Sequence, residues 1–197
     1  MPILRRIVRA DRTRYALWCC GLLGLCMLVS NGCDQINPWA AAPEEAVASA
    51  ASMPGKAPAA APVWALQNLD GKTQRLEDLR GTVVLLNFWA TWCPPCREEI
   101  PDLIRVHQAF AARGVTVVGL AVDDSGADAI KAFVAKYGIT YPVVLGNIDI
   151  AQQYRVNGIP ASFLIDRQGR IVKRWNGPRA EEAFTASIDA LLQQEAQ

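Results

Sequence analysis

Two long runs of apolar residues predict the buried strands of the fold. Residues 82–90, TVVLLNFWA, and residues 115–123, VTVVGLAVD, are rich in β-branched and aromatic side chains with little polar alternation. A strand that is buried on both faces has this continuous pattern, which is typical of parallel sheets covered by helices. We therefore expect both segments in the interior of one sheet.

Three other segments repeat apolar residues at helical spacing. Residues 95–112, 125–137 and 179–194 carry an apolar side chain at every third or fourth position, which predicts one apolar face on each helix. The first helix follows the first buried strand directly, and the second helix follows the second strand. This alternation predicts strands that pair in parallel.

Shorter elements complete the predicted fold. Asp70-Gly71 marks a turn within residues 69–81, which predicts a short hairpin or a strand and turn that lead into the first buried strand. After the second helix we expect an extended segment, a short helix and two strands joined by a turn, at 141–146, 149–155, 162–166 and 170–175. The fold class is therefore α/β, with a central mixed β-sheet flanked by helices and an N-terminal strand or hairpin extension.

The beginning of the chain has the composition of a targeting segment. Residues 15–30 are uncharged and mostly apolar, and five arginines precede them (Arg5, Arg6, Arg9, Arg12 and Arg14). The apolar run is shorter than the roughly 20 residues that span a bilayer. Basic residues followed by such a run are typical of an export signal, with the N-terminus left in the cytoplasm. Residues 1–33 are therefore predicted to be a signal or membrane-anchor segment.

The end of this segment leaves its processing open. Residues 30–33, SNGC, resemble the lipobox of bacterial lipoproteins, although Ser30 stands where that motif prefers a larger aliphatic residue. Lipidation of Cys33, an uncleaved anchor and cleavage a little further on are the three alternatives. Residues 34–62 are rich in alanine and proline and predict a flexible tether, because the prolines interrupt any alanine helix. Residues 63–197 then form the globular domain.

Composition and charge exclude several classes of protein. Hydrophobic residues make up 51% of the chain, which suffices for a core, and the formal net charge is +1. No basic block occurs outside the first 14 residues, so we expect no nucleic-acid partner. Of the six cysteines only Cys93 and Cys96 lie in the globular part, so the domain is no disulfide scaffold.

The pair Cys93-Pro-Pro-Cys96 could serve a metal, a structural disulfide or redox chemistry. A closed zinc site needs four ligands, which the domain does not supply near this pair. Two thiolates could hold Cu(I), and a Cu(I)-binding module or metallochaperone stays open as the alternative function. A disulfide across two residues closes almost no loop and is poorly placed to stabilise the fold. We therefore favour redox chemistry as the interpretation of this pair. We expect no cofactor beyond the Cys93–Cys96 disulfide.

The position of the pair assigns the two cysteines different roles. Cys93 follows a predicted strand and opens a predicted helix, where unpaired N–H groups and the helix dipole lower the pKa of a thiol. Pro95 suits the first helical turn. We expect Cys93 to be the nucleophile, and Cys96, one turn further in, to be more buried and to resolve the mixed disulfide.

The motifs FWATWCPPC and GIPASFLID resemble the thioredoxin fold, and specifically the membrane-tethered thiol–disulfide oxidoreductases of bacteria of the TlpA and ResA type. The resemblance covers residues 63–194. It implies a cis bond before Pro160 and a substrate-binding role for Trp92, Ile159 and Pro160. The backbone beside Ile159 would pair with an extended stretch of the client protein.

The same resemblance suggests how protons are handled. Thioredoxin has a buried aspartate on the strand before its motif, whereas this chain has Asn87, which cannot exchange a proton. In ResA-like proteins a glutamate three residues after the second cysteine takes part, and this position is Glu99. Residues three apart on a helix are neighbours, so Glu99 can act on Cys96.

Peroxiredoxins share the start of this pattern but require a threonine or serine and a proline where this chain has Ala90 and Leu86. We therefore do not expect peroxidase chemistry.

By resemblance, the domain is a protein disulfide reductase on the periplasmic side of the bacterial cytoplasmic membrane, held there by the N-terminal segment or a lipid on Cys33. Its partners would be client disulfides, in apocytochrome c or copper-site cysteines, and a membrane electron donor of the DsbD or CcdA type. We expect a monomer.

Overall fold

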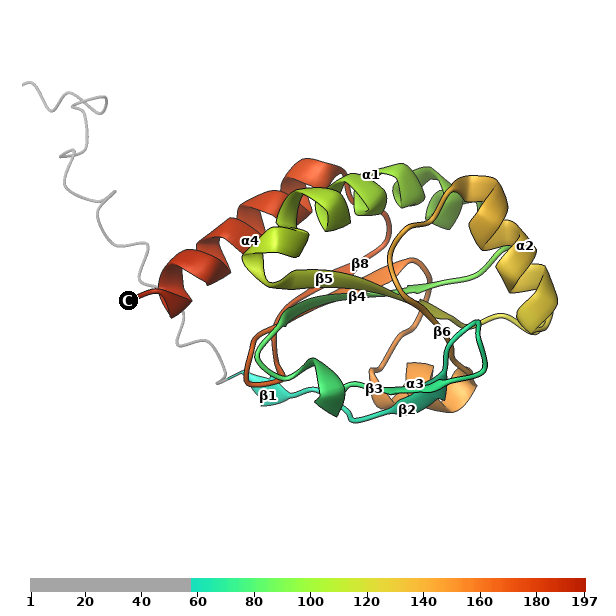
Figure 1. The fold of residues 1–197 in the computed structure, drawn as a ribbon, viewed down its shortest axis with the longest axis horizontal. Helices are drawn as coiled ribbons and strands as arrows, with labels where there is room; N and C mark the ends of the chain where they lie inside the picture. The colour runs from blue at the N-terminus through green and yellow to red at the C-terminus, as the bar shows by residue number, and fades with distance from the viewer. Residues whose placement is uncertain (1–57) are drawn as a thin grey trace, which may run out of the picture. The chain divides into compact units, whose positions relative to one another are not determined.

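A mixed β-sheet forms the middle layer of the domain (Figure 1). The computed structural model describes residues 58–197. The strands of this sheet are β1 (Ala59–Ala60), β4 (Val83–Trp89), β5 (Val115–Ala121), β6 (Val143–Leu145), β7 (Ala161–Ile165) and β8 (Arg170–Asn176). Their order is β1-β8-β7-β4-β5-β6, in which β4, β5 and β6 are parallel and β7, β8 and β1 are added antiparallel. The prediction of an α/β fold with a mixed sheet is confirmed.

Helices cover both faces of the sheet (Figure 1). Three of them pack on one face: α1 (Pro94–Phe110), α2 (Ala127–Tyr137) and α4 (Glu181–Glu195). The opposite face is covered by α3 (Ile148–Gln153) and by a hairpin of β2 (Ala65–Gln67) and β3 (Thr73–Arg75). Two 3-10 turns, Glu77–Leu79 and Ala111–Arg113, precede β4 and β5. The two apolar cores are separated by the sheet and share no buried residue.

Strand β4 supplies side chains to both cores because successive residues of a strand point to opposite faces. Val83, Leu85 and Trp89 face α1, and Val84, Leu86 and Phe88 face α3. Asn87 has the same parity as Leu85 and Trp89, so it faces α1 as a polar residue in a fully buried strand. A buried amide without partners would be costly, so its hydrogen bonds need to be identified.

The β2–β3 hairpin confirms the predicted N-terminal extension. Gly71 has a φ of 75°, a conformation that favours glycine. Asn68 Oδ1 accepts hydrogen bonds from the backbone N–H groups of Asp70 and Lys72, each at 3.0 Å. Asn68 also forms a β-bridge with Val144, so the turn residue links the hairpin to the main sheet.

Replacing Asn68 by alanine is expected to lower the free energy of unfolding by about 1 kcal/mol, because two backbone N–H groups of the turn lose their acceptor. Chemical denaturation of the full-length protein measures the change. Gln193→Ala, an exposed position in α4, is the control and should shift stability by less than about 0.5 kcal/mol. An equal effect of the two substitutions would contradict the role assigned to Asn68.

The domain begins earlier than the boundary expected at Val63. Ala59 and Ala60 pair with Ile171 and Arg170 of β8, and Ala61 is buried. The alanines form an edge strand because β8 offers them unpaired backbone groups, which composition alone does not reveal. The predicted segment 1–33, including Cys33, and residues 34–57 of the expected tether lie outside the described residues. Within residues 58–197 no helix is both long and apolar enough to span a membrane.

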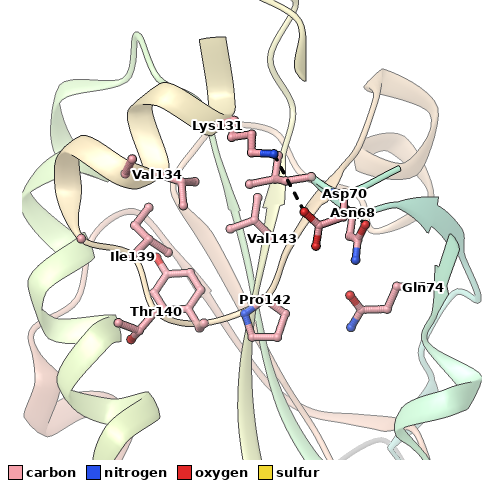
Figure 2. Close-up of a pocket in the computed structure, with 13 residues that line it drawn as sticks. Asn68, Asp70, Gln74, Lys131, Val134, Ile139, Thr140, Pro142 and Val143 are labelled. Atoms are coloured by element: carbon pink, nitrogen blue, oxygen red, sulfur yellow. Dashed lines mark hydrogen bonds and ion pairs between the residues drawn. The ribbon is translucent and has the colours of Figure 1, made fainter. Parts of the chain in front are cut away.

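A cavity of about 720 Å³ separates the hairpin from α2 and from the segment that enters β6. Figure 2 shows Lys131 of α2 pointing across it toward Asp70 of the hairpin, with Nζ and Oδ1 3.9 Å apart. Its lining includes neither the cysteine motif nor the segment around Pro160. This cavity is therefore separate from the chemistry that the sequence predicts.

Candidate active site

Cys93 and Cys96 form a disulfide at the start of α1. Cys93 is the N-cap residue, with extended backbone angles, and its Sγ accepts a hydrogen bond of 3.3 Å from the Cys96 N–H. Pro94 and Pro95 occupy the first helical positions, where a missing N–H costs nothing. The Cys93 sulfur therefore lies at the positive end of the helix dipole, which favours its thiolate once the disulfide is reduced.

Both cysteines are buried in this disulfide form, so exposure does not distinguish the nucleophile from the resolving cysteine. The exposed fractions are 3% for Cys93 and 2% for Cys96. Cys93 is covered because the loop before β7 lies over it, with the Ile159 carbonyl oxygen 3.8 Å from Cys93 Sγ. The asymmetry between the cysteines comes from helix position and neighbours, and not from exposure.

The loop before Cys93 is held by Asp123, a residue that the sequence analysis did not single out. Asp123 Oδ2 accepts hydrogen bonds from the N–H and the hydroxyl of Thr91, both at 2.6 Å, and Oδ1 accepts from the Ser125 N–H at 2.9 Å. Partial burial acts to raise the pKa of Asp123, but the hydrogen bonds from Ser125 and Thr91 outweigh it and lower the pKa. The anchored loop presents Trp92 to solvent, with 65% of its surface exposed.

Glu99 is a buried carboxyl group on the first turns of α1, only 2% exposed. Its Oε2 accepts a hydrogen bond from Asn87 Nδ2 at 2.9 Å, and its Oε1 accepts from the Arg179 N–H at 2.8 Å. Burial raises the pKa of Glu99 to about 7, against the opposing effect of these hydrogen bonds. At neutral pH such a group can either give or take a proton, one helical turn from Cys96.

Asn87 stands where thioredoxin has its buried aspartate, and it also holds Glu99 in position. Its amide donates to Glu99 and also to Ser162 Oγ at 2.9 Å, and Ser162 is its direct partner across the β4–β7 pair. Both side chains are buried. The contact between Asn87 and Ser162 could have been suspected from the sequence, because Ser162 is a polar residue within the apolar segment ASFLI. The contact between Glu99 and Arg179 could not, because it uses a backbone N–H, which every residue except proline has.

The Ile159–Pro160 peptide bond is cis, the isomer that the family resemblance implies. The Pro160 carbonyl accepts a hydrogen bond of 2.8 Å from the Gly177 N–H, which ties this loop to the end of β8. No backbone hydrogen bond joins Asn157, Gly158 or Ile159 to another residue of the described domain. The chain beside Cys93 therefore offers unpaired backbone groups to an incoming extended segment.

His107 lies further along α1, away from the cysteine pair. Its Nδ1 accepts a hydrogen bond from the Val117 N–H at 3.4 Å, and its ring meets Tyr141 edge to face. Burial lowers the pKa of His107, which favours the neutral ring that this contact needs. Among residues 58–197 no group of three or more His, Cys, Asp and Glu side chains is arranged to hold a metal ion.

Comparison with known proteins gives one consistent result. The family model described as "AhpC/TSA family" matches residues 58–174. The thiol–disulfide oxidoreductase ResA of Bacillus thuringiensis (strain Al Hakam) is 37% identical over 123 residues, which cover 62% of this chain and 70% of the relative. ResA of Bacillus subtilis (strain 168) is 38% identical over 122 residues, covering 61% and 68%.

Solved structures agree with these relatives. A putative thiol:disulfide interchange protein DsbE from Chlorobium tepidum superimposes with a TM-score of 0.64 at 36% identity, over 68% of this chain and 96% of that protein. StoA from Bacillus subtilis gives 0.57 at 26% identity, over 66% and 98%. The matches cover 96% of the Chlorobium protein and 98% of StoA, so the similarity concerns a complete domain.

Proposed function

The chain belongs to the AhpC/TSA family as a ResA-like thiol–disulfide oxidoreductase with a thioredoxin fold, and on this premise we propose that it reduces disulfides of specific client proteins outside the cytoplasm. The observation that carries the proposal is the Cys93–Cys96 disulfide at a helix start, one turn from the buried Glu99. These are the parts that a two-electron exchange with another disulfide requires.

The proposed reaction starts from the reduced pair. The Cys93 thiolate attacks one sulfur of the client disulfide, and the second client sulfur leaves as a thiolate. Cys96, once deprotonated, attacks Cys93 in the resulting mixed disulfide and displaces the remaining client sulfur. The pair ends oxidised, two electrons have passed to the client, and two protons convert the client thiolates to thiols.

Glu99 is the proposed proton acceptor for Cys96. Its raised pKa matches a thiol more closely than an ordinary carboxyl group would, and a closer match makes proton transfer easier. Asn87 and the Arg179 N–H keep the carboxyl group in place while its charge changes. Trp92 and the loop of Ile159 and Pro160 are the proposed contacts for the client, supported by the exposure of Trp92 and the unpaired loop backbone.

The direction of electron flow and the partners are those that the family resemblance implies. The clients would be apocytochrome c or proteins with copper-site cysteines, and a membrane electron donor of the DsbD or CcdA type would regenerate the dithiol. The arginines and the apolar run at the N-terminus support an anchor on the periplasmic side of the cytoplasmic membrane, with or without a lipid on Cys33. No cofactor beyond the disulfide takes part, and the working unit is a monomer.

Equilibrating the purified full-length protein with dithiol buffers tests this function. A reductase should show a two-electron potential nearer to the roughly −270 mV of thioredoxin than to the roughly −120 mV of DsbA. A potential close to that of DsbA would reverse the proposed direction. If the pair had no measurable potential but bound one equivalent of Cu(I) tightly, the protein would be a copper-binding module instead.

A further inference from the structure

A groove of about 590 Å³ adjoins the cysteine motif on the side of α3. Its apolar lining includes Trp92, Ile148 and Ile159. Trp92 and Ile148 are 65% and 68% exposed, and the described domain exposes only one other large apolar side chain to a comparable degree. Two such side chains in one groove beside a reactive cysteine indicate a surface that another molecule covers.

The rim of this groove is acidic. Asp123 and Asp124 line it, and Asp149 follows Ile148 in the first turn of α3. The carboxylate of Asp123 is occupied by Thr91 and Ser125. Asp124 and Asp149 are exposed, and neither has a basic side chain within 4.0 Å among residues 58–197. No lysine, arginine or histidine lines the groove, so its field is negative.

The groove is continuous with the place where the client must bind. Ile159 belongs to its lining, and the Ile159 carbonyl oxygen lies 3.8 Å from Cys93 Sγ. A client segment whose cysteine reaches Cys93 can pair with the free backbone at residues 157–159. Its neighbouring side chains would then lie over the apolar floor and beside the free carboxylates of Asp124 and Asp149.

From this arrangement we infer that the groove selects client segments that carry an apolar residue and a lysine or arginine close to the disulfide cysteine. The inference rests on the proposed reductase function and adds the class of client sequence to it. The apolar side chain would cover Trp92 and Ile148, and the cation would complement Asp124 and Asp149. An acidic segment would meet like charges and associate more slowly.

Synthetic peptides with an intramolecular disulfide test the selection. One peptide carries Leu and Lys beside the first cysteine, a second carries Leu and Glu, and a third carries Ser and Lys. The reduced full-length protein is mixed with each peptide, samples are quenched in acid, and the second-order rate constants of reduction are compared. The series is run at about 20 mM and about 0.5 M salt, because the higher concentration shortens the screening length to a few ångströms.

At low salt, reduction of the Leu–Lys peptide should be about tenfold faster than that of the Leu–Glu peptide, and the ratio should fall below about twofold at high salt. Replacing both Asp124 and Asp149 by asparagine should remove the preference at low salt as well. Asp128→Asn is the matched control, because Asp128 is an exposed carboxylate at the start of α2 outside the groove lining. Ile148→Ser should abolish the advantage of the Leu–Lys peptide over the Ser–Lys peptide.

Two results would overturn the inference. Equal rates for the lysine and glutamate peptides at low salt would exclude charge selection while leaving the reductase function intact. A preference that survived in the Asp124→Asn/Asp149→Asn protein would place its origin outside this groove. Failure of the fully reduced protein to reduce any peptide would instead overturn the proposed function, and the selection with it.

Discussion

The Cys96→Ser variant is expected to accumulate a stable mixed disulfide between Cys93 and the client, with turnover reduced more than about a thousandfold. Cys93 at the N-cap of α1 keeps the environment that favours its thiolate, so it can still attack a client disulfide. Without the Cys96 sulfur no group resolves the adduct. Non-reducing electrophoresis with mass spectrometry detects the adduct and identifies the cysteine that carries it.

The reciprocal variant is the control for this prediction. Cys93→Ser removes the sulfur that lies 3.8 Å from the Ile159 carbonyl oxygen and should trap nothing, because Cys96 is one helical turn further along α1. Adducts that form through Cys96 in Cys93→Ser, and are missing in Cys96→Ser, would reverse the roles of the two residues. A variant that traps clients also offers a direct way to isolate them.

Glu99 is expected to make the oxidised protein less stable as the pH rises. Its pKa is raised from 4.5 to about 7 in the folded state, so the folded protein holds a proton that the unfolded chain has already lost between these values. The stabilisation is complete at low pH and is lost as the pH rises through 7. From about pH 5 to about pH 8 the contribution of Glu99 should fall by about 2–3 kcal/mol.

Chemical denaturation of the disulfide form across this pH range measures the effect as the difference between the wild type and Glu99→Gln. Taking the difference cancels His107, whose lowered pKa gives a pH dependence of the opposite sign. Glu98→Gln is the matched control, because Glu98 is the exposed neighbour of Glu99 on the same helix. Parallel pH profiles for wild type and Glu99→Gln would show that Glu99 titrates as an ordinary surface carboxylate.

The helices and strands that are determined by local sequence could be predicted well. The run at 82–90 became β4 at Val83–Trp89, and the run at 115–123 became β5 at Val115–Ala121. The helix expected at 95–112 is α1, Pro94–Phe110. Continuous burial and helical spacing are properties of neighbouring residues, so no tertiary information was needed to recognise them.

The strand β1 shows where local reasoning failed. Ala59 and Ala60 lie in an alanine- and proline-rich stretch without strand character, and they are extended because the edge of β8 accepts them. Strand pairing of this kind depends on a partner more than a hundred residues away along the chain. A two-residue edge strand therefore cannot be recognised from its own sequence.

For the site, the sequence by itself determined the reactive group: two cysteines separated by two prolines, at the junction of a buried strand and a helix. That position decides which sulfur lies at the helix start, because the helix N-terminus is a local feature. The tertiary structure alone decided how Glu99 is tuned. Arg179 lies 80 positions from Glu99, and Ser162 lies 75 positions from Asn87.

The same distinction holds for the client side of the site. Trp92 and Ile159 were predicted from a family resemblance. Asp124 and the exposed Ile148 line one groove with them only after the end of β5, α3 and the loop before β7 have come together. Reactivity follows from a few adjacent residues and can be read along the chain. Proton affinity and client choice depend on burial and on charges brought together by folding, so they exist only in the folded domain.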